Sequence, residues 1–179
     1  MNHKHPVKFA SLLLAMLVLL ISCSAYFNWR AFKFSEDELT FMLPCKPDEA
    51  SKEVQIGEEK QNMTMAACNV GDLNFTISRL KRPKNVTQEA MFELWQKASW
   101  YAVSGTQSQE TPVAQKIEIK INNKSIAAQE LTFEKNMKVH WRWFEQGSWT
   151  YQLGIYFSKD KYKGSLSQET IDMFFNAIE

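Results

Sequence analysis

The chain is poor in histidine, and this scarcity excludes several kinds of active site. It has three histidines, and two of them, His3 and His5, precede an apolar run near the amino terminus. His140 is the remaining one. A metal centre built from several histidines is therefore excluded after that run. A hydrolase active site that needs a histidine as its general base would have to use His140.

The chain also lacks an excess of charge of either sign. Lys and Arg together number 21, and Asp and Glu together number 20. Nothing in this balance indicates a nucleic acid as partner. The sequence contains no internal repeat, phosphate-binding loop, dinucleotide fingerprint or nucleophile elbow. We therefore expect a non-catalytic domain without a cofactor.

The amino-terminal segment has the layout of a bacterial signal peptide. Lys4 and Lys8 precede an apolar run over residues 9–22. A run of about fourteen residues suits a signal peptide and is shorter than the roughly 20 residues of a spanning helix. We therefore expect residues 1–22 to be removed. An uncleaved anchor helix over residues 7–27 is the alternative, and both place the remainder outside the cytoplasm.

The apolar run ends in Leu20-Ile21-Ser22-Cys23, which resembles the lipobox of bacterial lipoproteins. The resemblance implies that Cys23 carries a diacylglyceryl group and becomes the acylated amino terminus. Two or three acyl chains anchor a protein durably, whereas one does so only marginally. It also implies that Ser24 permits transport to the outer membrane, since aspartate at that position retains a lipoprotein at the inner one. We therefore expect a lipid-anchored envelope protein that faces the periplasm.

Lipidation of Cys23 would leave two of the three cysteines, Cys45 and Cys68, as a pair. In an oxidising periplasm such a pair is most simply a structural disulfide. Two cysteines are too few for a zinc site. We therefore predict a disulfide between Cys45 and Cys68 and no metal site.

The expected organisation is a tether at residues 23–34 and a single domain at residues 35–179. The tether is rich in aromatic residues, which fits a membrane-interface belt or a first strand packed on the domain. A basic run at residues 159–163 is expected to be a solvated loop, with a membrane-surface role as the alternative.

Local signals predict a series of antiparallel strands and a central helix. Gly71-Asp72 predicts a two-residue turn that pairs Cys68 with Phe75 and directs Cys68 into the core. Thr87 is the predicted cap of a helix that ends at Ser104-Gly105. The apolar stripe of this helix is expected to be core, with a ligand groove as the alternative.

Strands, a helix, two hairpins and a final helix follow one another, which predicts an α+β fold with an antiparallel sheet flanked by helices. This order, with Phe41-Met42-Leu43-Pro44 and then Lys46-Pro47, resembles the PsbP-like α/β sandwich and the DcrB-type bacterial lipoproteins. The resemblance implies an accessory or assembly role, and it transfers no functional residue to this chain.

The hairpin of residues 139–145 and 148–158 is the most aromatic part of the chain. A two-residue loop at Gln146-Gly147 would mix core and surface residues. A three-residue loop that also includes Glu145 would pair Trp143 with Trp149 and gather the large apolar groups on one face. We predict this second arrangement. The opposite face, open to solvent or a partner, would then carry His140, Arg142, Thr150 and Gln152.

These observations favour a membrane-tethered periplasmic lipoprotein that acts as a non-catalytic binding or assembly accessory domain. Its expected partner is another envelope protein or a lipid. The alternative function is an envelope hydrolase that uses two carboxylates and no histidine. A buried pair of acids would favour that alternative, but Glu36, Asp37 and Glu38 are predicted to lie solvated in a turn.

Overall fold

The computed structural model describes residues 27–56, 58–105, 111–162, 164 and 166–179. The predicted signal peptide and Cys23 lie outside these residues. The elements in chain order are β1 (Arg30–Phe32), β2 (Phe41–Leu43), β3 (Asp48–Ile56), β4 (Glu59–Val70), β5 (Leu73–Lys81), α2 (Gln88–Ser104), β6 (Gln115–Ile121), β7 (Lys124–Glu134), β8 (Met137–Gln146), β9 (Trp149–Ser158) and α3 (Gln168–Asn176).

Seven strands form one antiparallel sheet in the order β3-β4-β5-β9-β8-β7-β6. The strands β3 to β5 form one half through consecutive pairing. Helix α2 then carries the chain to the far edge, and β6 to β9 return to the centre, where β9 pairs with β5. The strands β1 and β2 form a separate pair. The large sheet therefore consists of two meanders that are joined side by side.

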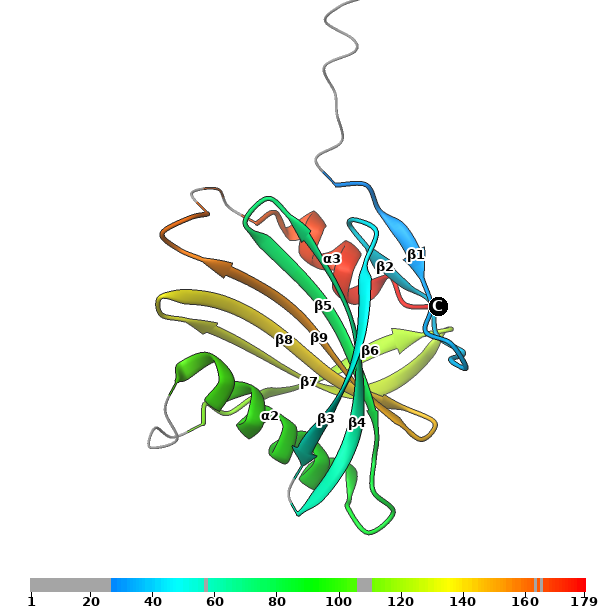
Figure 1. Ribbon diagram of the computed structural model, residues 1–179. Coiled ribbons are helices and arrows are strands. Elements are labelled where there is room, and N and C mark those ends of the chain that lie inside the picture. Colours follow the sequence, from blue (N-terminus) through cyan, green and yellow to red (C-terminus); the bar gives the residue numbers. More distant parts are fainter. Residues whose placement is uncertain (1–26, 57, 106–110, 163, 165) are drawn as a thin grey trace, which may run out of the picture.

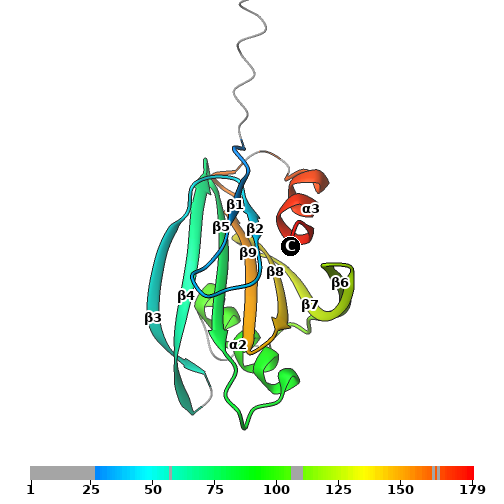
Figure 2. The same ribbon diagram turned by 90° about the vertical axis from the view of Figure 1, so that its right-hand side faces the viewer.

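Both faces of the large sheet are covered. Figures 1 and 2 show α2 across one face and α3 with the β1-β2 pair over the other. Buried residues accordingly form two clusters, one on each face. Strands account for 52% and helices for 18% of the described residues. The predicted α+β class is therefore wrong. The molecule is a sandwich dominated by β-structure, because one of its covering layers is itself partly made of strands.

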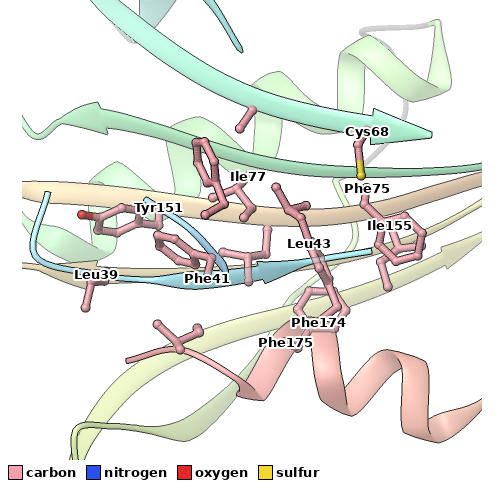
Figure 3. Packing of buried hydrophobic residues seen from close by; sticks show 14 of the residues in the cluster. Leu39, Phe41, Leu43, Cys68, Phe75, Ile77, Tyr151, Ile155, Phe174 and Phe175 are labelled. Carbon is pink, nitrogen blue, oxygen red and sulfur yellow. The ribbon is translucent and has the colours of Figure 1, made fainter. Parts of the chain in front are cut away.

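The larger cluster lies between the sheet and the layer formed by α3 and β1-β2. Figure 3 shows Phe174 of α3 beside Phe75 of the sheet, and their ring centroids are 5.2 Å apart. Phe41 of β2 is fully buried in the same cluster. The carboxyl terminus closes this layer, since Thr40 and Glu179 exchange two backbone hydrogen bonds of 2.6 and 3.0 Å.

Part of the predicted tether packs on the domain. Strand β1 pairs with β2, and ahead of it the rings of Phe27 and Trp29 lie 6.1 and 6.4 Å from the ring of Phe75. Residues 27–34 correspond to the packed first strand that the sequence offered as one of two alternatives.

The predicted turn and helix caps are confirmed. The turn at Gly71 pairs Cys68 with Phe75, as predicted. The Thr87 hydroxyl accepts a backbone N–H at the start of α2, and Gly105, with a left-handed φ of 70°, follows its last residue. These features depend on short stretches of sequence, and the local chemistry is sufficient to define them.

The predicted register of the β8-β9 hairpin is wrong. Its loop consists of the two residues Gly147-Ser148, and Trp143 pairs with Gln152. Trp143 faces α2, whereas Tyr151 belongs to the cluster on the opposite face. The prediction assumed that the hairpin buries only one face. That assumption fails because each face of the sheet is covered by another layer.

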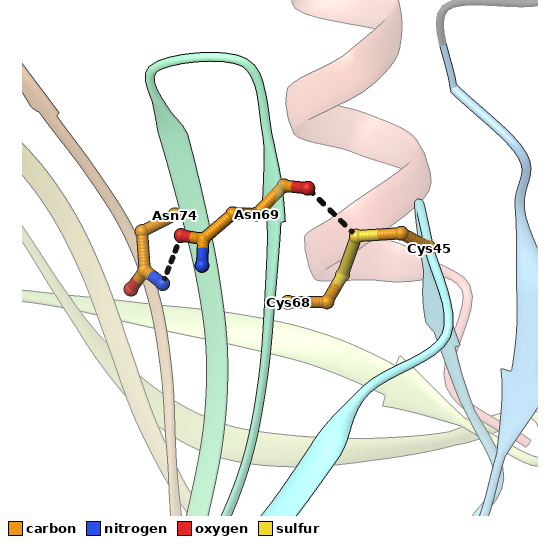
Figure 4. Close-up of a disulfide and its surroundings, with 4 residues drawn as sticks. All are labelled: Cys45, Cys68, Asn69 and Asn74. Atoms are coloured by element: carbon orange, nitrogen blue, oxygen red, sulfur yellow. Dashed lines mark hydrogen bonds between the residues drawn. A yellow bond between two sulfur atoms is a disulfide. The ribbon is translucent and has the colours of Figure 1, made fainter.

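The predicted disulfide between Cys45 and Cys68 is confirmed (Figure 4), with the two Cα atoms 5.9 Å apart. Cys45 follows β2, and Cys68 lies in β4 with its side chain in the larger cluster. The Cys45 sulfur also lies 3.4 Å from the carbonyl oxygen of Asn69. The disulfide therefore joins the β1-β2 pair to the large sheet.

Candidate functional site

An open groove lies on the face of the sheet that α2 covers, beyond the helix. In Figure 1, α2 crosses one end of this face, and no other described element lies over β5, β9 and β8 at the opposite end. The groove has a volume of about 600 Å³. Its lining includes Met65, Ala67, Thr76 and Tyr156, from three adjacent strands.

A second cavity of about 280 Å³ adjoins this groove, between α2 and the sheet. Both spaces are lined by Met65 and Tyr156. The other walls of the cavity are mostly apolar and include Ile56, Met63 and Trp95. Ligand sites in proteins are typically concave and largely apolar, with few polar groups. We call the groove and the cavity together the apolar channel.

Gly154 makes room for the aromatic wall of the apolar channel. A Cβ atom at Gly154 would lie 2.6 Å from the ring of Tyr156 and 2.9 Å from the hydroxyl oxygen of Thr76. The Tyr156 hydroxyl accepts a hydrogen bond of 2.9 Å from the indole N–H of Trp141. Burial raises the pKa of Tyr156. The phenol is therefore a neutral, fixed part of the wall.

Gln152 and Thr150 lie on the α2 face and are buried, so the prediction that they belong to a face open to solvent is wrong. The Gln152 amide donates a hydrogen bond of 2.7 Å to the hydroxyl of Ser99 on α2. The Thr150 hydroxyl donates one of 2.9 Å to Glu145. Only 5% of Gln152 and none of Thr150 is exposed. Gln152 is nevertheless part of the lining of the cavity.

Arg142 lies on the opposite face, where it holds the end of α3. Its guanidinium donates hydrogen bonds of 2.6 Å to Glu130 and 2.8 Å to the backbone carbonyl of Phe175. A cation is favourable at the carboxyl end of a helix, where carbonyl groups lack partners. Because only 7% of Arg142 is exposed, the prediction that it lies on an open polar face is also wrong. The four residues of the predicted polar face do not share one surface.

His140 is half-buried, and its imidazole lies beside a threonine hydroxyl group. Its Nδ1 lies 3.2 Å from the hydroxyl oxygen of Thr132 on β7. Burial, followed by the positive charge of Lys138, lowers its pKa. In the part of the chain that the structure describes, no carboxylate is hydrogen-bonded to the imidazole. The oriented base that a histidine-dependent hydrolase needs is therefore not assembled there.

Asp37 is buried, although it was predicted to be solvated. Its carboxylate accepts a hydrogen bond of 3.1 Å from the guanidinium of Arg79 and one of 2.7 Å from the hydroxyl of Tyr151. Burial, and then the hydrogen bond to Asp37, raises the pKa of Tyr151. Among the described residues, Asp37 is the only aspartate or glutamate that is buried. Its close partners are a cation and a phenol, so it is not half of a carboxylate pair.

Within the described ranges, no group of three His, Cys, Asp or Glu side chains is placed so that it could hold a metal ion. No helix in the same ranges combines the length and apolar character needed to cross a bilayer.

No protein-family model and no curated protein matches this chain. The resemblance of the leader to a lipobox, and of the remaining chain to PsbP-like and DcrB-type proteins, therefore stays a prediction from the sequence.

Proposed function

We propose that this protein is a lipid-anchored lipoprotein of the bacterial envelope, and that its domain faces the periplasm and binds a partner without catalysis. The observation that carries the proposal is the apolar channel. Its cavity has mostly apolar walls, and its open groove combines apolar residues with polar ones, which is the composition of many ligand sites. The partner is a lipid or an apolar part of another envelope protein.

The anchoring part of the proposal is supported by the sequence and by the disulfide. The lipobox-like residues end at Cys23, and the residue that follows, Ser24, favours sorting to the outer membrane. The bond between Cys45 and Cys68 is stable in the oxidising periplasm and unusual in the cytoplasm. The charges and the apolar run that precede Cys23 fit export of the domain that follows.

The non-catalytic part is supported by the two groups that a hydrolase would most readily use. His140 is paired with a threonine, and Asp37 is neutralised by Arg79. Neither group lines the apolar channel. The apolar channel is therefore separate from these two groups.

Processing at Cys23 tests the anchoring part of the proposal. Full-length wild type, Cys23→Ala and the control Cys45→Ala are produced in a bacterium that processes lipoproteins and then partitioned between water and a detergent phase. The wild type should enter the detergent phase as a mature chain that lacks residues 1–22. The control should be processed in the same way, whereas Cys23→Ala should accumulate as the longer precursor. Processing of Cys23→Ala to the mature length would overturn the anchor.

A further inference from the structure

We propose that the apolar channel holds an acyl chain of a phospholipid from the membrane in which the protein is anchored. This inference rests on the proposed function, because it takes the anchor at Cys23 as the source of proximity to lipid. It goes further in naming the chemical class of the ligand and the end of the domain by which the ligand enters.

The walls of the apolar channel suit a flexible, unbranched apolar chain. Three methionines line the channel, namely Met63, Met65 and Met137. Methionine side chains are flexible and polarisable, and they adapt to apolar ligands of variable shape. The cavity beneath α2 adds Trp95 and Trp141 and is mostly apolar, whereas half of the residues that line the groove are polar or charged. An acyl chain could therefore lie in the groove with its end in the cavity.

The mouth of the groove lies at the end of the domain where the amino-terminal tether leaves. Phe75 contacts Phe27 on one face of the sheet, while its chain neighbours Asn74 and Thr76 line the groove on the other. Figures 1 and 2 both show the start of the described chain, ahead of β1, at the end that carries the turn between β4 and β5, and α2 lying at the other end. The open end of the channel and Phe27, the first described residue, therefore lie at the same end of the domain.

The tether is too short to hold this end far from the membrane. Three residues, 24–26, separate Cys23 from Phe27. The four intervening steps of chain span at most about 14 Å when fully extended. An acylated Cys23 would therefore keep the mouth of the groove within reach of lipid headgroups.

The rim of the groove carries charges that complement a zwitterionic headgroup. Lys161 and Asp72 both line the groove and are exposed. Among the described residues, neither takes part in an ion pair, whereas the neighbouring Lys159 pairs with Glu134 at 2.7 Å. The Lys161 ammonium suits a phosphate, and the Asp72 carboxylate suits the ammonium of a phosphoethanolamine head.

Photocrosslinking tests this assignment. The full-length protein is placed in vesicles of phosphatidylethanolamine and phosphatidylglycerol that contain phosphatidylethanolamine with a diazirine in its acyl chain. After irradiation and digestion with trypsin, lipid should be attached to the peptides 61–79 and 143–159, which line the channel. The peptide 125–135, which does not line it, should carry little. Absence of lipid from both channel peptides would overturn the proposal, as expected if a polypeptide occupied the groove instead.

Matched variants separate binding in the channel from general contact with the membrane. Met65→Trp fills the point that groove and cavity share, and it should abolish crosslinking to peptide 143–159. Met173→Trp makes the same change on the exposed side of α3 and should preserve it. Equal crosslinking in the two variants would contradict the proposal.

A variant at the rim of the groove keeps the proposal testable if Met65→Trp does not fold. Lys161→Glu changes an exposed side chain and should reduce crosslinking roughly two- to fivefold, the scale of one exposed ion pair. Lys120→Glu, on the edge strand β6, should leave it unchanged. No reduction in Lys161→Glu relative to this control would count against the headgroup assignment.

Cys23→Ala distinguishes failure of this inference from failure of the anchor. With the photoreactive lipid supplied in detergent micelles, Cys23→Ala should still be crosslinked in the channel peptides. Loss of lipid modification with retained crosslinking in Cys23→Ala is the result that both assignments predict. A wild type that is crosslinked in the channel peptides but is not lipid-modified at Cys23 would refute the lipoprotein assignment alone. A wild type that is lipid-modified but not crosslinked would refute the acyl-chain assignment alone.

Discussion

At the scale of single residues, the buried charge of Arg79 is matched by the groups around it. Its guanidinium lies over the rings of Phe34 and Trp149, 4.6 and 4.2 Å from their centroids. It also pairs with Asp37 and donates a hydrogen bond of 2.6 Å to the carbonyl oxygen of Ser35. Arginine tolerates such a site because its guanidinium is weakly hydrated and stacks on aromatic faces. These contacts hold the turn that contains Asp37 against the sheet.

Replacing Asp37 with alanine should destabilise the fold strongly. The change leaves the Arg79 charge buried without a counter-ion, which costs about 3–5 kcal/mol. Urea denaturation would measure the free energy of unfolding. The control is Glu38→Ala, because Glu38 is exposed and its removal should change stability by no more than about 0.5 kcal/mol. Similar losses in both variants would show that the Asp37–Arg79 pair has no special role.

His140 should make stability depend on pH in mildly acidic solution. Its folded pKa is lowered by burial and then by Lys138, so the unfolded chain binds a proton more readily. Below the unfolded pKa of about 6.5, the folded state should therefore lose stability as the pH falls. The Tm of the wild type should drop more than that of His140→Gln between about pH 7.5 and pH 5.5. A His140 midpoint above about 6.5 in an NMR titration would contradict this.

At the scale of elements, α3 depends on Arg142 for its attachment. Arg142→Ala should cost roughly 2–4 kcal/mol, less than a fully buried pair would, because its partner Glu130 is partly exposed. Hydrogen exchange should show that α3 loses protection before the strands do. Arg30→Ala, at an exposed position of β1, is the control and should have little effect. If Arg142→Ala is as stable as the control, its buried contacts contribute nothing to docking.

The disulfide should stabilise the attachment of β1-β2 to the sheet. Cys45 and Cys68 are 23 residues apart in sequence, and closing a loop of this size contributes about 3 kcal/mol in the chain-entropy estimate. A reducing agent should therefore lower the free energy of unfolding of the wild type by about that amount. It should not affect the double variant Cys45→Ala/Cys68→Ala. Thiol labelling of unfolded, unreduced protein would be evidence against the bond.

Local elements could be predicted from the sequence where a few adjacent residues determine them. The turn at Gly71-Asp72 and the caps of α2 belong to this group. The register of β8-β9 could not be predicted in the same way, because it depends on which faces are buried. The alternation of Trp141 and Trp143 with Arg142 suggested one apolar face, yet Arg142 is buried too. The sequence also contained a sign that Arg79 is buried, which the prediction missed: this charged residue lies in β5, a strand with several apolar residues.

At the scale of the whole molecule, the apolar channel exists because α2 is shorter than the sheet it covers. Its 17 residues span about 26 Å, whereas the 12 residues of β4 span about 40 Å. Part of the sheet face is therefore left open beyond the helix. The sequence suggested a ligand groove along α2 only as an alternative, and Trp95 does line the cavity. The position of the opening depends on how the helix crosses the sheet, which no single segment encodes.

The most direct test of the account is the mass of the amino-terminal peptide of the protein purified from bacterial membranes. We expect this peptide to begin at Cys23 and to carry a diacylglyceryl group, with a further acyl chain on its amino group. An amino terminus at Met1 with an unmodified Cys23 would contradict it and would favour an uncleaved anchor helix.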